Sequence, residues 1–124
     1  GLAYEVGSQH EAEVNYGFFA AHASVDSKNI TKAKKLILEQ FSKLQHITDK
    51  ELKEAKNYIE GSFLLDYEDT QKLADGLLFW EHVNKASDMF SYLDRIKKVT
   101  KSDVKRVAKK YLTSQCTTTI IRGK

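Results

Sequence analysis

Four histidines are the residues of this sequence that could hold a catalytic metal, and their neighbours decide whether they do. Zinc hydrolysis needs two histidine ligands one helical turn apart, with a glutamate between them to act as the base. The segment His10–Val14 (His-Glu-Ala-Glu-Val) nearly matches H-x-x-E-H, but Val14 stands where the second histidine must be. The segment Leu78–His82 fails from the other end, because it lacks the first histidine. We therefore expect no complete zinc site in this chain.

The other reactive side chains are expected to serve structure rather than chemistry. His22 lies in an apolar stretch and is expected to be a satisfied core residue, whereas His46 precedes a helix and is expected to be exposed. Cys116 is the only cysteine and has no histidine near it in sequence, and a strand cysteine is most often a small buried hydrophobe. No serine lies in a G-x-S-x-G turn, and no glycine-rich phosphate loop occurs. The chain alone should therefore be inactive.

Composition predicts one soluble globular domain spanning residues 1–124. Hydrophobic residues make up 41% and charged residues 30% of the chain, which is ordinary for a globular protein of this size. No apolar run approaches the roughly 20 residues that span a bilayer, so we expect no membrane partner. A single cysteine rules out an intrachain disulfide framework. The absence of disulfides favours the cytoplasm, although nothing in the sequence names a compartment.

The charge pattern does not predict a nucleic-acid partner. The net charge of +3 comes from 20 basic and 17 acidic residues whose signs are interspersed, as in Lys50–Glu54. Interspersed charges on helices are usually solvated faces with pairing between residues one turn apart. Only Lys97–Lys110 shows a basic bias. A nucleic-acid binder is therefore kept only as the weakest alternative.

The opening residues read as a strand already under way. In Gly1–Val6 the side chains of Leu2, Tyr4 and Val6 share one face, which is the period-2 pattern of a half-buried strand. No cap or starting methionine precedes them. We therefore expect this chain to be a piece of a longer protein whose N-terminal strands are missing here.

The elements that follow predict an α+β fold, with an antiparallel sheet and helices packed on one face. Gln9–Asn15 is predicted as a hairpin connection, and Tyr16–Val25 as a strand that is covered on both faces because it is almost continuously apolar. Cys116–Arg122 is rich in β-branched residues and is predicted as a terminal strand.

Helix starts are marked by capping residues. Asp26 or Ser27 can cap the first helix, whose apolar positions have helical spacing. Thr48–Glu51 is a capping box, and Thr100–Asp103 repeats the device with aspartate in the third place. The predicted helices after the first run over Asp49–Asp66, Thr70–Val83, Ser87–Lys98, and from Thr100 to near Leu112.

Three stretches together resemble the pitrilysin/insulinase family of zinc peptidases, which includes the mitochondrial processing peptidases. These stretches are Gly1–Val6 with Gly17-Phe18-Phe19, then Thr48–Leu65, and then Arg95–Val104 running into Val107–Leu112. None is a catalytic signature, but their order and spacing cover essentially the whole chain. The resemblance implies the half-domain fold of these metallopeptidases. It places this chain in the C-terminal half, which does not bind zinc, is usually described as inactive and closes over the substrate.

The resemblance implies a role for one residue, Tyr4. In the family the second half carries an arginine seven residues before a tyrosine; Tyr4 matches the tyrosine, and the arginine would fall before Gly1. The implied role is a hydrogen bond from the phenol to the scissile carbonyl as it becomes an oxyanion, and one such donor is worth about 10²–10³ in rate. The alternative is that Tyr4 is a strand tyrosine that packs on helices.

The resemblance also implies partners. No cofactor is expected in this chain, because zinc belongs to an N-terminal domain or a partner subunit, and the substrate is a peptide that lies along a sheet edge. The leading hypothesis is the C-terminal domain of a zinc-dependent metallopeptidase. The alternative is a catalytically inactive structural or assembly subunit of the same family. An arginine seven residues before Tyr4 would favour the peptidase, and both a homodimer and a heterodimer are compatible with the sequence.

Overall fold

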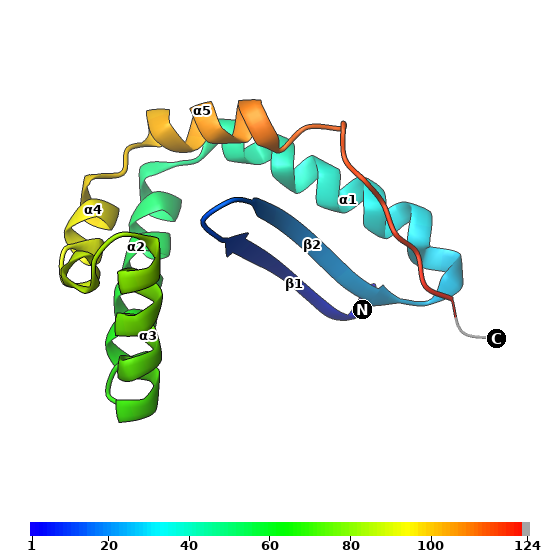
Figure 1. Cartoon of the computed structure of the whole chain (residues 1–124). Helices are drawn as coiled ribbons and strands as arrows, with labels where there is room; N and C mark the ends of the chain where they lie inside the picture. The colour runs from blue at the N-terminus through cyan, green and yellow to red at the C-terminus, as the bar shows by residue number, and fades with distance from the viewer. Residues whose placement is uncertain (123–124) are drawn as a thin grey trace. The chain divides into compact units, whose positions relative to one another are not determined.

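The computed structural model describes residues 1–122, in which a β-hairpin is followed by helices (Figure 1). Short 3-10 turns join several of the longer elements. The longer elements are β1 (Ala3–Ala12), β2 (Gly17–Val25), α1 (Ile30–Lys43), α2 (Asp49–Asp66), α3 (Thr70–Val83), α4 (Tyr92–Lys98) and α5 (Lys101–Tyr111). This arrangement confirms the predicted α+β class with an antiparallel sheet.

The elements form two compact units. The first contains Gly1–His46 with the segment that begins at Lys105, and the second runs from Ile47 to Val104. That residues 1–124 act as one domain therefore stays a prediction.

The hairpin is longer than its sequence pattern indicates. β1 continues through the polar residues that were predicted as a connection, and Ala12 still pairs with Gly17. The loop is therefore short, and it is closed by a hydrogen bond of 2.8 Å from the Glu13 N–H to the Tyr16 carbonyl. A strand with an open face tolerates polar side chains, which is why the polar run did not end it.

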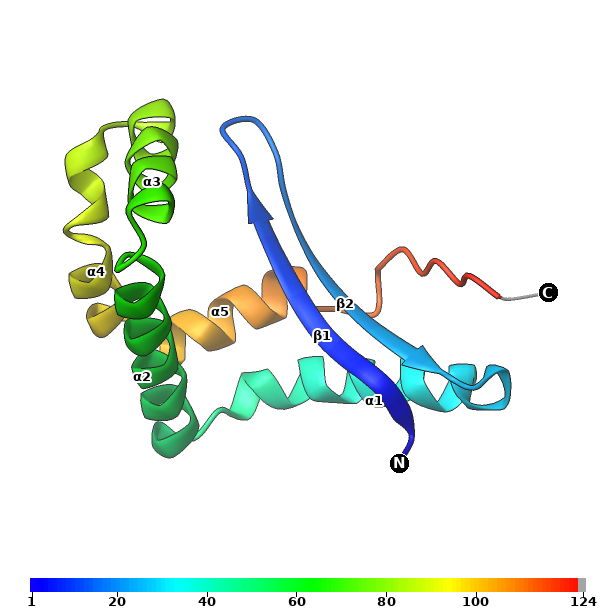
Figure 2. The ribbon, with the colours of Figure 1, turned by 90° about the horizontal axis from the view of Figure 1, so that it is seen from below.

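Helix α1 covers one face of the hairpin, beside β2 (Figures 1 and 2). Phe19 of β2 meets Phe41 of α1 edge to face, with ring centroids 5.8 Å apart, and Ala33 of α1 is buried. Alternate residues of β2 face away from α1, and among them His22 is exposed. The predictions that β2 is covered on both faces and that His22 is a core residue are therefore wrong, because His22 lies on the face of β2 that points away from α1 and is exposed.

Both predicted capping boxes are present in the structure. The Thr48 hydroxyl accepts the Glu51 N–H at 3.2 Å, and the Glu51 carboxylate accepts the Thr48 N–H at 2.8 Å. At the second box, the Thr100 hydroxyl accepts a hydrogen bond from the Asp103 N–H at 3.2 Å, and the Asp103 carboxylate accepts one from the Thr100 N–H at 3.0 Å. Each pair satisfies amide groups that a helix start leaves without a partner. Helices α2 and α3 have the predicted bounds, and α3 begins after Asp69, whose carboxylate accepts hydrogen bonds from the N–H groups of Gln71 and Lys72.

The predicted helix Ser87–Lys98 is instead a 3-10 turn, Ala86–Met89, followed by α4. The carbonyl of Asp88 accepts bonds from the Ser91 hydroxyl at 3.0 Å and from the Arg95 guanidinium at 3.2 Å. The same carbonyl accepts the Ser91 N–H at 3.2 Å, which is the i+3 pairing of a 3-10 turn, and the side-chain bonds compete with the i+4 pairing of a continuous α-helix.

An aromatic cluster holds the second unit together. The rings of Phe63 and Tyr92 stack at 5.3 Å, and Tyr92 lies 5.8 Å from Trp80. The Arg95 guanidinium lies 5.0 Å from the centre of the Trp80 ring, a distance at which a cation and an aromatic face attract. These contacts join α2, α3 and α4.

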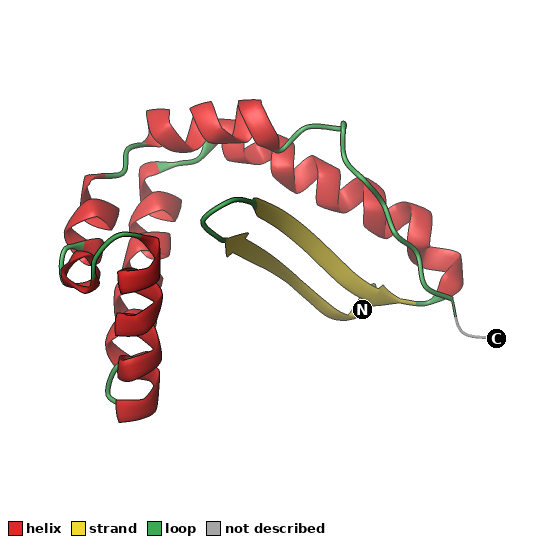
Figure 3. Cartoon of the chain, in the orientation of Figure 1, coloured by secondary structure: helices red, strands yellow, loops and turns green. Residues whose placement is uncertain are grey.

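The predicted terminal strand is wrong. Residues 116–122 form no strand (Figure 3). They are exposed, and the thiol of Cys116 is free and exposed rather than buried. A strand needs a neighbour to complete its hydrogen bonds. Within the described residues the sheet consists of β1 and β2 alone, and this segment pairs with neither.

Candidate functional site

Tyr4, the candidate site residue from the sequence, lies at an irregularity of β1. Ala3 pairs with Val25 and Glu5 pairs with Ser24, so that Tyr4 has no partner in the register. A bulge of this kind bends the strand and redirects a side chain. The ring is 79% exposed, so the structure does not pack Tyr4 on a helix, which was the alternative left open by the sequence.

The Tyr4 hydroxyl makes a hydrogen bond with the residue that follows β2. It donates a hydrogen bond of 3.0 Å to Oδ1 of Asp26, the residue that follows β2. This hydrogen bond raises the pKa of the Tyr4 phenol above its ordinary value, and the negative charge of Asp26 is the second largest cause of the rise. The phenol is therefore a neutral hydrogen-bond donor throughout the physiological pH range.

Asp26 was one of two residues, with Ser27, that the sequence offered as the first helix cap, and the structure gives its side chain a different partner. It occupies the N-cap position of the 3-10 turn Ser27–Asn29, yet its side chain makes no capping hydrogen bond. Oδ2 lies 3.9 Å from the ammonium group of Lys28, whose side chain is 80% exposed, while that of Asp26 is 48% exposed. The carboxylate thus lies between a phenol donor and a surface cation.

A second polar contact lies on the open face of the hairpin. His22 Nε2 lies 3.9 Å from Glu5 Oε1. Gly7 faces His22 in the register, and a Cβ at Gly7 would come within 2.8 Å of the imidazole. The ring of His22 therefore lies over the backbone of β1, and the small size of Gly7 allows it to do so.

These side chains do not form a metal centre. Within residues 1–122 no group of three or more His, Cys, Asp or Glu side chains is placed to hold an ion. His10 lies in β1, so the segment that nearly matches H-x-x-E-H is not helical at His10. His46 precedes α2 and is exposed, as predicted.

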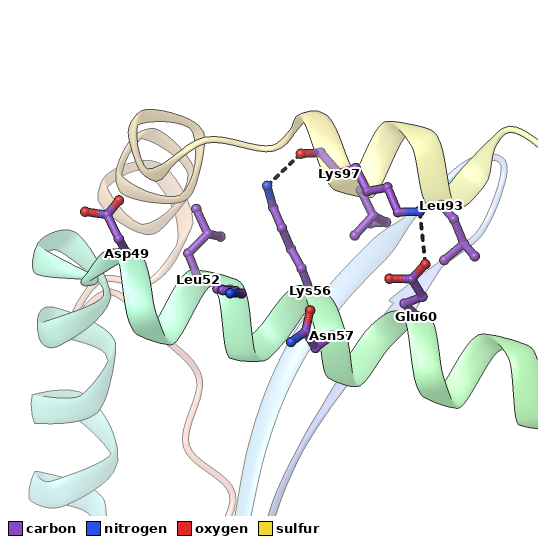
Figure 4. A pocket seen from close by; sticks show the side chains of 9 residues that line it. Asp49, Leu52, Lys56, Asn57, Glu60, Leu93 and Lys97 are labelled. Atoms are coloured by element: carbon purple, nitrogen blue, oxygen red, sulfur yellow. Dashed lines mark hydrogen bonds and ion pairs between the residues drawn. The ribbon is translucent and has the colours of Figure 1, made fainter.

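The second unit contains a cavity of about 330 Å³ between α2 and α4, which the sequence did not indicate (Figure 4). The Lys56 ammonium donates to the carbonyl of Lys97 at 2.7 Å, and the Lys97 ammonium lies 2.9 Å from Glu60. Because Glu60 pairs with it, the pKa of Lys97 is raised. The polar groups at the rim thus bind one another and tie α4 to α2, so the cavity is explained by helix packing.

Comparisons with known proteins agree with this fold. The family model described as "Peptidase M16 inactive domain" matches residues 1–59, a range that includes Tyr4 and Asp26. The crystal structure of the periplasmic protease PqqL from Escherichia coli is similar, with a TM-score of 0.65 and 19% sequence identity; the match covers 89% of this chain and 13% of that chain. No curated protein matches the sequence.

These two matches confirm the resemblance to the C-terminal half-domain of pitrilysin-type peptidases. The chain spans only about 13% of the length of the similar protease. Within residues 1–122 no helix is both long and apolar enough to cross a membrane. The similar protease is described as periplasmic, so the expected cytoplasmic location is not confirmed.

Proposed function

We propose that this chain, a C-terminal half-domain of the pitrilysin-type peptidases, closes over a peptide substrate and presents the Tyr4 hydroxyl to the scissile carbonyl. The proposal treats residues 1–124 as one domain of a zinc-dependent peptidase, in a monomer or a dimer. It is carried by one observation: Tyr4 offers an exposed, protonated hydroxyl from a strand within the residues that match the family model.

The residue type suits the reaction. When water attacks a peptide carbonyl, negative charge develops on the carbonyl oxygen, and a donor aimed at that oxygen stabilises the transition state. A phenol on a strand is held by two dihedral angles only, so little conformational freedom is lost when it binds.

Zinc is assigned to the N-terminal domain or to a partner subunit. When bound there, it would supply the activated water for hydrolysis. A zinc site needs at least three protein ligands, and within residues 1–122 no group of that size is placed to hold an ion. The part of this chain would be to orient the substrate and to stabilise charge.

The test is Tyr4→Phe in the full-length protein. We expect turnover of a fluorogenic peptide to fall by up to about 10²–10³-fold, because one oxyanion donor is lost, while zinc content stays unchanged. Tyr16→Phe is the matched control, since Tyr16 is 64% exposed near the turn of the same hairpin. Wild-type turnover in the Tyr4→Phe protein would return Tyr4 to a structural role.

A structural or assembly subunit is the second candidate, and exposed apolar side chains favour it. Tyr58 and Leu65 of α2 are 77% and 69% exposed, and residues seven apart share one helix face. Between them Gly61 is open, with no atom within 4 Å of a Cβ placed there. Such a surface is typical of a protein interface.

Three observations on the full-length protein separate these functions: its upstream sequence, its zinc content and its binding to a partner. An arginine seven residues before Tyr4, a first half with H-x-x-E-H and stoichiometric zinc support the peptidase. A subunit without these features, which loses its partner when Leu65 is changed to Asp, supports the assembly role.

A further inference from the structure

Asp26 lies at the junction between β2 and the following 3-10 turn, and its backbone and side chain serve different partners. Its carbonyl accepts the N–H of Asn29 at 2.8 Å, which closes the turn. Aspartate at such a position usually also accepts an N–H of the turn through its side chain. Here the carboxylate makes no such bond, and Oδ1 accepts the Tyr4 hydroxyl at 3.0 Å instead.

The strand register explains why the two side chains meet. Val25 pairs with Ala3 in antiparallel register, so Asp26 lies just beyond the end of the hairpin while Tyr4 lies one residue inside it. The bulge after Ala3 frees Tyr4 from the register and redirects its side chain. The contact thus depends on two local features, the bulge and the unused cap.

We propose that Asp26 restrains Tyr4 in a resting state, because a phenol has one proton and cannot donate it to Asp26 and to a substrate at once. This inference rests on the proposed role of Tyr4. A carboxylate is a stronger acceptor than a neutral carbonyl, so Tyr4 stays with Asp26 while the substrate is in its ground state. As the carbonyl oxygen becomes negative, it competes with Asp26 for the proton, and the hydrogen bond moves to the substrate.

The charged groups around this contact set the strength of the restraint. The Lys28 ammonium, 3.9 Å from Oδ2, partly offsets the charge of Asp26. Glu5 lies next to Tyr4 in β1 but is directed to His22 on β2, at 3.9 Å. Removal of Glu5 therefore changes the local charge without removing the acceptor of Tyr4.

The experiment compares Asp26→Ala with Glu5→Gln, its matched control, in the full-length protein. Each change is made with Tyr4 present and in the Tyr4→Phe background, and kcat/KM is measured on a fluorogenic peptide. Because the contact is exposed, we expect Asp26→Ala to raise kcat/KM by about 2–5-fold with Tyr4 present and to have no effect with Phe at that position. Asp26→Asn keeps a neutral acceptor and should give a smaller rise.

A second readout does not depend on activity. In protein with ¹³C-labelled tyrosine rings, the Tyr4 resonance is assigned as the one that Tyr4→Phe removes, and its phenol is titrated. We expect the phenol pKa to fall toward its ordinary value in Asp26→Ala and to stay unchanged in Glu5→Gln.

The outcomes separate the two proposals. An unchanged Tyr4 titration, an unchanged or lower kcat/KM in Asp26→Ala, or an equal rise in the Tyr4→Phe background overturns the restraint alone, provided that Tyr4→Phe is impaired. Wild-type activity of Tyr4→Phe overturns the proposed function and the restraint together.

Discussion

Gly76 of α3 lies against the ring of Tyr67: a Cβ at Gly76 would come within 2.5 Å of Cε1 and 2.7 Å of the hydroxyl oxygen. The ring cannot move away freely, because its other neighbour is Phe63, with ring centroids 4.6 Å apart. The same surroundings bury Tyr67 in part, and this burial raises the pKa of its phenol. Gly76, in the middle of α3, therefore leaves room for the ring of Tyr67, which follows α2.

Gly76→Ala should destabilise the protein, although alanine is the better helix former. Overpacking of this kind costs roughly 1–3 kcal/mol, which exceeds the gain of about 0.5–1 kcal/mol in helix propensity. Gly61→Ala in α2 is the matched control: it meets no atom within 4 Å and should gain that propensity alone. Denaturant unfolding of the two variants measures both effects, and a more stable Gly76→Ala protein would contradict the packing described here.

Thr48→Ala should destabilise α2. The change removes the hydroxyl that accepts the Glu51 N–H, and loss of such a cap costs about 0.5–2 kcal/mol. Hydrogen exchange at the first turn of α2 in the full-length protein reports the loss locally. Thr118→Ala, in the exposed C-terminal segment, should leave this exchange unchanged, and equal effects of the two changes would argue against the cap.

The pH dependence of this cap has a defined sign. The Thr48 hydroxyl donates a hydrogen bond that lowers the pKa of Glu51 in the folded protein, and the hydrogen bond from the Thr48 backbone N–H is the second largest cause. A carboxyl with a lowered folded pKa stabilises the protein above its unfolded pKa, and this stabilisation is lost as pH falls through the folded pKa. Wild type should therefore unfold at a higher denaturant concentration than Glu51→Gln at neutral pH, and the two midpoints should converge in acid. A constant difference across this range would show that the charge of Glu51 is not involved.

Local signals in the sequence predicted much of the fold. Thr48 and Thr100 cap helices as expected, because a capping box is completed within four residues of chain. The expectation for His22 failed because burial depends on what covers a strand, and His22 lies on the hairpin face that points away from α1. The expectation for Cys116 failed because its segment forms no strand. The terminal strand failed because β-branched residues favour a strand only when a neighbouring strand is present.

The candidate site also contains one part that the sequence predicted, Tyr4, and one that it did not, the contact of Tyr4 with Asp26. Tyr4 came from a resemblance to a family and its strand from alternation of side chains, and both are local in sequence. Asp26 was considered, beside Ser27, only as a helix cap, which is the usual local role of an aspartate before a helix. Its contact with Tyr4 joins residues 22 positions apart, and it follows from the hairpin register and a bulge, which no short pattern reveals.

The exposed C-terminal segment has a practical consequence for work with the isolated chain. Residues 116–121 contain no charge, proline or glycine and are exposed, which is the composition of segments that pair between molecules into sheets. A free, exposed thiol stands at the start of this segment. The purified chain should therefore associate as its concentration rises and form cross-linked dimers in air, which light scattering with and without a reducing agent would reveal.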